Sequence, residues 1–124
     1  MSSSKVTIDA VEDGFPSVFH ENHIELFVNA KSDANGLRRH MLTSRTVCKV
    51  DCGFSFIIPE GYHFIVEGMP EHLAKGLIVH QSFTNGRAEV YVNNLGKEIV
   101  VLDHGQKIAD LYIIECCEIK RKKK

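Results

Sequence analysis

Short segments in which apolar and polar residues alternate, separated by turn residues, run through most of this 124-residue chain. In the stretch from Val50 to Ile58, every second residue is apolar or cysteine. Successive side chains of a β-strand point to opposite faces of the sheet, so this spacing predicts a strand with one buried face. Similar segments cover residues 23–30, 62–69, 76–83, 87–94, 98–102 and 108–119.

Turn residues separate these segments at intervals of about eight to twelve residues, which is typical of an all-β sandwich or barrel. The clearest hairpin turn runs from Thr84 to Arg87, because Asn85 and Gly86 tolerate the positive φ angles that tight hairpins need. Residues 33–45 fit the strand pattern least well, and we expect a helical turn over residues 37–42. The predicted fold class is all-β.

The chain is long enough for one domain and too short for a second core. We expect this domain to span residues 1–119, with a basic tail at residues 120–124. The net charge of −1 argues against whole-domain binding of nucleic acid or a membrane, and leaves the tail as a weak contact for phosphate or an acidic partner. No apolar run approaches the roughly 20 residues that span a bilayer, and the first residues lack signal-peptide features, so we expect a cytoplasmic protein.

Four cysteines raise the question of a metal site. Cys116 and Cys117 are neighbours, and on a strand they would point to opposite faces. Cys48 and Cys52 have a spacing that suits ligands on a helix, whereas their surroundings indicate a strand. We therefore expect buried or spare thiols, and no resident cofactor.

Residues 94–113 resemble the late segment of the trimeric dUTPase and dCTP deaminase superfamily. That segment has an Asn-x-Gly turn, a strand and then Gly-x-Arg-Ile-Ala-Gln-Leu. Residues 50–80 likewise resemble the family's strand, Pro-x-Gly turn, next strand and active-site segment, and residues 23–30 fall where the family has a Gly-Tyr-Asp-Leu element. In this chain the late element stands as Gly105-Gln106-Lys107-Ile108-Ala109-Asp110-Leu111.

The resemblance covers almost the whole chain in order, although no single motif is matched in full. It implies a jelly-roll fold, or distorted β-barrel, and a homotrimer whose sites form between subunits. It also implies that several positions with chemistry in the family are altered here. The family's phosphate-binding run begins with Arg-Ser, whereas this chain has Pro70 and Glu71, and a carboxylate repels a triphosphate. The nucleotide-binding candidates are Glu71, His72, Lys75, Arg87 and Gln106.

The catalytic positions are altered as well. The catalytic aspartate of dUTPases aligns with Gln81, whose neutral amide has no useful basicity near pH 7, and the sugar-stacking tyrosine aligns with Thr84. The catalytic glutamate of the deaminases aligns with Tyr91, with Glu89 two residues earlier on the same strand face. If the chain is an enzyme, the catalytic candidates are Glu89, His80 and Gln81. His72 or His80 would be the base, because histidine as a residue type is suited to acid–base chemistry near neutral pH.

Two candidates have simpler alternatives. Glu25 corresponds to an aspartate near the family's sugar and metal site, so it is the Mg²⁺ ligand if the chain hydrolyses nucleotides; a solvated strand-edge carboxylate is the alternative. Arg87 directly follows the hairpin turn and is otherwise a solvated strand residue. The glycine-rich closing tail of the family is replaced by a basic end.

Three functions remain open. The unaltered scaffold with several altered site positions favours a non-catalytic homotrimer that binds an unknown macromolecule, or that forms a structural piece of a larger assembly such as a virus particle. A viral protein of this kind would lie in the host cytoplasm or the virion. The alternatives are a diverged dUTP diphosphatase or dCTP deaminase, and a nucleotide binder without turnover.

Overall fold

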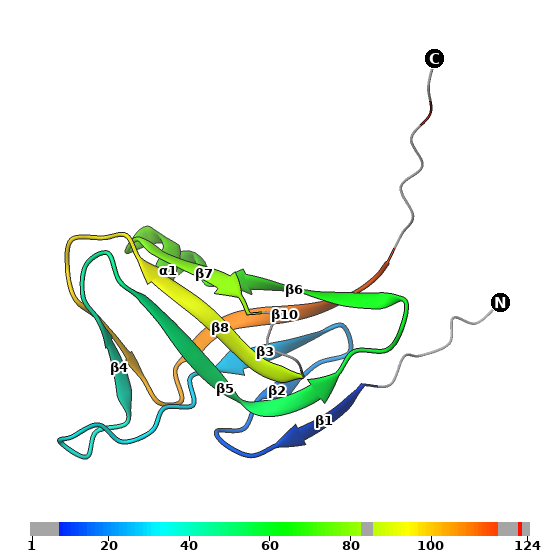
Figure 1. Ribbon diagram of the computed structural model, residues 1–124, viewed down its shortest axis with the longest axis horizontal. Helices are drawn as coiled ribbons and strands as arrows, with labels where there is room; N and C mark the ends of the chain where they lie inside the picture. The colour runs from blue at the N-terminus through cyan, green and yellow to red at the C-terminus, as the bar shows by residue number, and fades with distance from the viewer. Residues whose placement is uncertain (1–7, 83–85, 117–121, 123–124) are drawn as a thin grey trace.

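Figure 1 shows the computed structural model, which describes residues 8–82, 86–116 and 122. The first strands are β1 (Asp9–Glu12), β2 (Val18–Phe19), β3 (His23–Phe27), β4 (Arg39–Leu42), β5 (Val47–Ile57) and β6 (Tyr62–Gly68). A short helix and four more strands follow, which are α1 (Pro70–Ala74), β7 (Leu77–Gln81), β8 (Arg87–Asn94), β9 (Val100–Asp103) and β10 (Lys107–Glu115). The expected all-β fold class is confirmed.

The strands form two four-stranded sheets and one two-stranded sheet. The larger sheets have the strand orders β1-β5-β8-β7 and β2-β3-β10-β6, and the third sheet pairs β4 with β9. All of these pairs are antiparallel. In Figure 1, β4 and the end of the molecule that carries α1 lie on the left.

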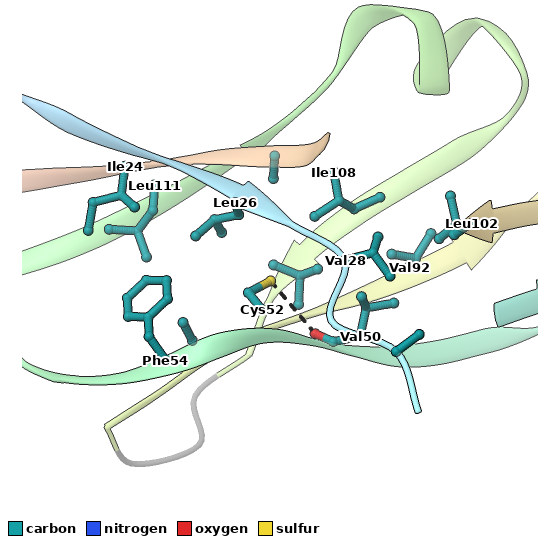
Figure 2. Close-up of a cluster of buried hydrophobic side chains, with 14 of the residues drawn as sticks. Ile24, Leu26, Val28, Val50, Cys52, Phe54, Val92, Leu102, Ile108 and Leu111 are labelled. Atoms are coloured by element: carbon teal, nitrogen blue, oxygen red, sulfur yellow. Dashed lines mark hydrogen bonds between the residues drawn. The ribbon is translucent and has the colours of Figure 1, made fainter. Parts of the chain in front are cut away.

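The hydrophobic core lies between the two four-stranded sheets (Figure 2). Leu26 on β3 and Leu111 on β10 face Val50 and Phe54 on β5, and each of the four is at most 1% exposed. Burying a side chain of this size contributes about 1.5–3 kcal/mol to folding. The predicted buried face of β5 is confirmed, because every second residue from Val50 to Phe56 is buried.

Gly105 forms the tight turn between β9 and β10. Its φ angle is +85°, a region that glycine enters at little cost. A Cβ atom at this position would also lie 2.8 Å from the ring of Phe15. This turn therefore requires glycine for two independent reasons, and it sets the position of Gln106 at the start of β10.

The helical turn expected over residues 37–42 is wrong. Residues 39–42 form β4, which pairs with β9, and Leu42 is 1% exposed. The prediction relied on the local polar composition. Pairing with a strand some 60 residues later in the chain decides the structure of this segment instead. The short elements α1, β1 and β2 were not predicted; β1 carries mostly exposed side chains and forms through its pairing with β5.

Some predictions fall outside the described residues. These are residues 84 and 85 of the predicted hairpin turn, Cys117, and residues 120, 121, 123 and 124 of the predicted tail. The helix found among the described residues is five residues long, far short of a membrane span.

Candidate functional site

His72 and Gln106, two of the predicted nucleotide-binding residues, are in contact. His72 lies on α1 and is 4% exposed, and its Nε2 atom is 3.1 Å from Nε2 of Gln106. Oε1 of Gln106 accepts a hydrogen bond from the backbone N–H of Asp103 at 3.1 Å, so the amide nitrogen of Gln106 faces His72 as a donor. We therefore assign His72 as a neutral imidazole that accepts at Nε2 and carries its proton on Nδ1.

The proton-bearing Nδ1 atom of His72 is buried and has no hydrogen-bond partner among the described residues. Burial lowers the pKa of His72 and outweighs the attraction of the neighbouring carboxylate of Glu71. A protonated ring would also place an N–H group against the amide N–H of Gln106. His72 is thus a neutral ring directly after Pro70 and Glu71, the two positions at which the family has arginine and serine.

Glu71 lies on α1 beside His72, and Lys75 lies at the end of the helix, but their surroundings differ from that of His72. Neighbouring residues of a helix point about 100° apart, so α1 turns His72 inward and leaves Glu71 and Lys75 exposed. The helix has no side-chain cap at its start, and Glu71 in its first turn is the residue that would repel an anion there. The three candidates therefore do not share one face of α1.

Gln81 links the two larger sheets. Its Oε1 accepts a hydrogen bond from the backbone N–H of Val66, and its Nε2 donates one to the backbone oxygen of Phe64, each at 3.2 Å. Both ends of the amide therefore hold β7 against β6. The neighbouring candidate, His80, is exposed and lies opposite Tyr91 on β8.

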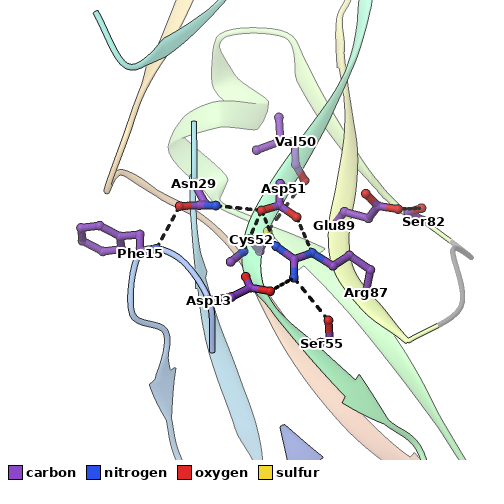
Figure 3. A network of polar contacts seen from close by, with 11 residues as sticks. Asp13, Phe15, Asn29, Val50, Asp51, Cys52, Ser55, Ser82, Arg87 and Glu89 are labelled. Atoms are coloured by element: carbon purple, nitrogen blue, oxygen red, sulfur yellow. Dashed lines mark hydrogen bonds and ion pairs between the residues drawn. The ribbon is translucent and has the colours of Figure 1, made fainter. Parts of the chain in front are cut away.

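Arg87 is the centre of the polar network in Figure 3. Its guanidinium binds Asp51 through Nε and Nη2, both at 2.7 Å, and binds Asp13 through Nη1 at 2.6 Å. The hydrogen bond from Arg87 lowers the pKa of Asp13. Burial alone would raise the pKa of Asp51, but the hydrogen bonds from Arg87 and Asn29 outweigh it and lower the pKa. Arg87 is thus not the solvated strand residue that the sequence suggested as an alternative.

Glu89 lies on the same sheet as this network and faces away from the core. It pairs across the strands with Asp51, is 9% exposed, and accepts a hydrogen bond from the Ser82 hydroxyl at 3.3 Å (Figure 3). A shared catalytic site would need Glu89 to contact His72. No hydrogen bond found among the described residues joins the two. Glu89 and the pair His72–Gln106 form two separate groups.

Glu25 lies on β3, an internal strand, so it is not the strand-edge carboxylate that the sequence suggested as the alternative. Its Oε1 is 2.9 Å from Nζ of Lys107, and its Oε2 is 2.7 Å from Nε2 of His20. These two hydrogen bonds, that from His20 foremost, lower the pKa of Glu25. The Lys107 ammonium also contacts Asp110 at 3.0 Å and therefore lies between two carboxylates.

These surroundings do not fit a Mg²⁺ site. Mg²⁺ needs several oxygen ligands in near-octahedral geometry, and both oxygens of Glu25 already face nitrogen groups. Within the described ranges, no three His, Cys, Asp or Glu side chains are grouped to hold a metal ion. Cys48, Cys52 and Cys116 are free thiols, and burial raises the pKa of Cys48 and of Cys52.

Sequence reasoning missed the partners of these residues. Asp51 and Asp13 lie 36 and 74 positions from Arg87, and the sequence gives no local signal for either contact. Lys107 stands at the arginine position of the late family element. This position indicated that Lys107 is important, but Lys107 was not among the candidate residues.

No protein-family model matches this sequence, and no curated protein sequence matches it significantly. Solved structures do match. The EIAV dUTPase aligns with a TM-score of 0.71 at 18% identity, over 94% of this chain and 95% of that chain. This chain has a dUTPase-like fold. A mutant dUTPase from phage phi11 of S. aureus aligns similarly, with a TM-score of 0.69 at 14% identity over 95% and 96% of the two chains.

A third dUTPase with this fold comes from Staphylococcus bacteriophage 80alpha, with a TM-score of 0.70 at 13% identity over 94% of this chain and 95% of that chain. Phage dUTPases of this group are described as controlling the transfer of virulence genes by a proto-oncogenic G protein-like mechanism. Identities this low establish the dUTPase-like fold alone.

Proposed function

We propose that this chain uses its dUTPase-like fold as a non-catalytic, homotrimeric module that binds a macromolecule. The observation that carries the proposal is the position of Gln81. Gln81 aligns with the family's catalytic aspartate, and both the oxygen and the nitrogen of its amide form hydrogen bonds with the backbone of β6. A neutral side chain held in this way neither accepts a proton from water nor turns toward a substrate.

The other candidate residues support the same proposal. Arg87, the cation nearest the hairpin, is bound to Asp51 and Asp13 and is therefore a poor phosphate ligand. His72 is neutral and buried, and Glu71 adds a negative charge beside it. These residues could have taken the place of the family's phosphate-binding groups. Each of them instead stabilises the fold or opposes an anion.

The proposed homotrimer rests on the likeness to dUTPases. It extends that likeness from the fold of one chain to the oligomeric state. A symmetric oligomer repeats one binding surface, which raises the avidity for a repeated or large partner. The phage 80alpha dUTPase supports a regulatory use of the fold, because its group is described as controlling gene transfer. A structural role in a larger assembly, such as a virus particle, would use the same surface repetition.

A diverged nucleotide enzyme is the second candidate, and one observation favours it. Glu89 is 9% exposed and lies beside the Ser82 hydroxyl, an environment from which a carboxyl group can act as an acid or base. In that case Glu89 would act with His80, and Mg²⁺ would be needed for dUTP hydrolysis. The placement of Glu89 away from His72 and Gln106 weakens this candidate.

The test is a product assay on the purified 124-residue chain. dUTP and dCTP are supplied with Mg²⁺, and the release of pyrophosphate and of ammonia is measured beside the EIAV dUTPase as the positive control. The proposal expects no release above the rate without protein, and light scattering should give a mass of three chains. Turnover that is lost in Glu89→Gln would establish the enzyme instead.

A further inference from the structure

A groove of about 550 Å³ lies between Lys75, at the end of α1, and strand β9. It is lined by the basic residues Lys75 and Lys97, by Glu98, and by the apolar residues Ile99, Val100 and Val101. None of the ion pairs found among the described residues involves Lys75 or Lys97.

Exposed apolar side chains concentrate around this groove. Ile99 is 57% exposed and Val101 37%, and Met41, which pairs with Val101 across β4 and β9, is 55% exposed. Leu73 on α1 and Leu95 before the groove are each about 60% exposed. A cluster of large, exposed apolar residues rimmed by charged groups is typical of a protein-binding surface.

The two lysine-bearing segments are held at a fixed distance. The backbone N–H of Leu95 donates to the oxygen of Gly76 at 2.9 Å. A Cβ atom at Gly76 would lie 2.8 Å from the nitrogen of Gly96, and one at Gly96 would lie 2.7 Å from the oxygen of Lys75. Because two glycines let these backbones touch, the spacing of Lys75 and Lys97 is set before any partner binds, which lowers the entropy cost of binding.

We propose that this groove, together with Ile99, Val101 and Met41, is the docking site for a segment of a protein partner that is acidic and carries apolar side chains. The proposal rests on the binding function proposed above and names the chemistry of its partner. Carboxylates of the segment would pair with Lys75 and Lys97, and its apolar side chains would cover Ile99 and Val101. The charge of the groove thus selects the partner, and its apolar surface provides most of the affinity.

Other occupants fit these observations less well. A two-fold contact of this surface with its own copy would bring Lys75 and Lys97 against their counterparts, a like-charge contact. A neighbouring subunit of a threefold ring would present a different surface here, and the mass of the Ile99→Ser variant tests that case. A nucleotide or nucleic acid would satisfy the lysines, but its phosphates would meet Glu98 and its contacts would leave Ile99 and Met41 uncovered. An acidic segment with apolar side chains satisfies both parts of the surface.

The test is a selection of short random peptides displayed on phage against the purified 124-residue chain. We expect the selected peptides to combine Asp or Glu with Leu, Ile or Phe. The double variant Lys75→Glu/Lys97→Glu should bind them at least about tenfold more weakly, a loss of about 1.4 kcal/mol. Ile99→Ser should also weaken binding several-fold.

The matched control is Lys31→Glu/Lys49→Glu, which reverses the same number of charges at exposed positions away from the groove and should change binding less than about twofold. Urea unfolding of each variant separates lost binding from lost folding. The proposal is overturned if no peptide family emerges, if the selected peptides lack acidic residues, or if they bind the double variant as tightly as the wild type. It is also overturned if Ile99→Ser lowers the mass in solution, since the surface would then join copies of this chain.

This selection and the product assay fail independently. Turnover of dUTP or dCTP would remove the non-catalytic function and leave the selected peptides as they are. Failure of the selection without turnover would remove the groove as the docking site and leave the binding module without a located surface.

Discussion

Arg87 binds Asp51 through two parallel hydrogen bonds, from Nε to Oδ1 and from Nη2 to Oδ2, each 2.7 Å long. Asp51 also accepts a hydrogen bond from Asn29 at 2.8 Å, and Asn29 in turn accepts one from the backbone N–H of Phe15 at 2.9 Å. The network therefore joins the loop after β1 to strands β5 and β8. The donors of Arg87, which the resemblance predicts to bind a nucleotide, are thus engaged by Asp51 and Asp13.

Replacing Arg87 by Met should destabilise the protein. The change removes the bidentate contact and leaves the half-buried carboxylate of Asp51 without its cation, so we expect a loss of about 1–3 kcal/mol in the free energy of unfolding. Arg87→Lys should recover only part of this, because an ammonium cannot form the two parallel bonds. Urea unfolding measures both, with Lys49→Met on the same face as a control that should stay within about 0.5 kcal/mol. An unchanged midpoint for Arg87→Met would show that the network contributes nothing.

The same network predicts how stability depends on acid. The pKa of Asp51 is lowered in the folded state, so the unfolded chain binds more protons in the range between the two pKa values. The contribution of Asp51 is therefore complete above its unfolded pKa of about 3.9 and declines as pH falls below it toward the folded pKa. Urea midpoints between about pH 6 and pH 2.5 should fall more steeply in the wild type than in Asp51→Asn. Parallel curves would contradict this assignment.

His72 should be a neutral ring with its proton on Nδ1. Nitrogen-15 NMR of the imidazole measures the tautomer directly, and His72→Gln identifies the signal. Because burial lowers the pKa of His72, we expect its titration midpoint below the usual value of about 6.5. Its contribution to stability is then complete above about pH 6.5 and declines as pH falls toward the folded pKa. A proton found on Nε2 at pH 7 would mean that the amide of Gln106 is reversed.

Restoring the family's catalytic residue at position 81 should not restore catalysis. In Gln81→Asp the shorter side chain loses its hydrogen bonds to Val66 and Phe64, which should cost about 1–3 kcal/mol of stability. We expect no pyrophosphate release from dUTP, because losing the hydrogen bonds between position 81 and β6 does not create a phosphate-binding site. The adjacent exposed residue supplies the control, since His80→Asp should change stability by less than about 0.5 kcal/mol. Hydrolysis by Gln81→Asp would mean that one residue separates this chain from an enzyme.

Much of the fold was predictable because it follows from local patterns. The alternation from Val50 to Phe56 gives the buried face of β5, and Gly105 gives the turn before β10. β4 was not predictable in this way, because its polar sequence becomes a strand only through pairing with β9. The same limit applies to the short helix α1, which lies between two strands.

The candidate site was predictable in composition and not in arrangement. The altered positions at Glu71 and Gln81 follow from the resemblance alone. What those residues do instead depends on contacts between distant segments, such as Gln81 with β6 or Arg87 with Asp13. His72 and Gln106, 34 positions apart, meet because α1 follows β6 and β6 pairs with β10, the strand that begins beside Gln106.

The most direct test of the central claim is a calorimetric titration of the folded protein with a non-hydrolysable dUTP analogue, and separately with dCTP, in the presence of Mg²⁺. The EIAV dUTPase serves as the positive control for the analogue. Because Arg87 and Gln81 are bound within the fold, the protein should give no saturable heat up to about millimolar nucleotide, which corresponds to a binding free energy weaker than about −4 kcal/mol. Saturable binding in the micromolar range would contradict this account and identify the chain as a nucleotide-binding protein.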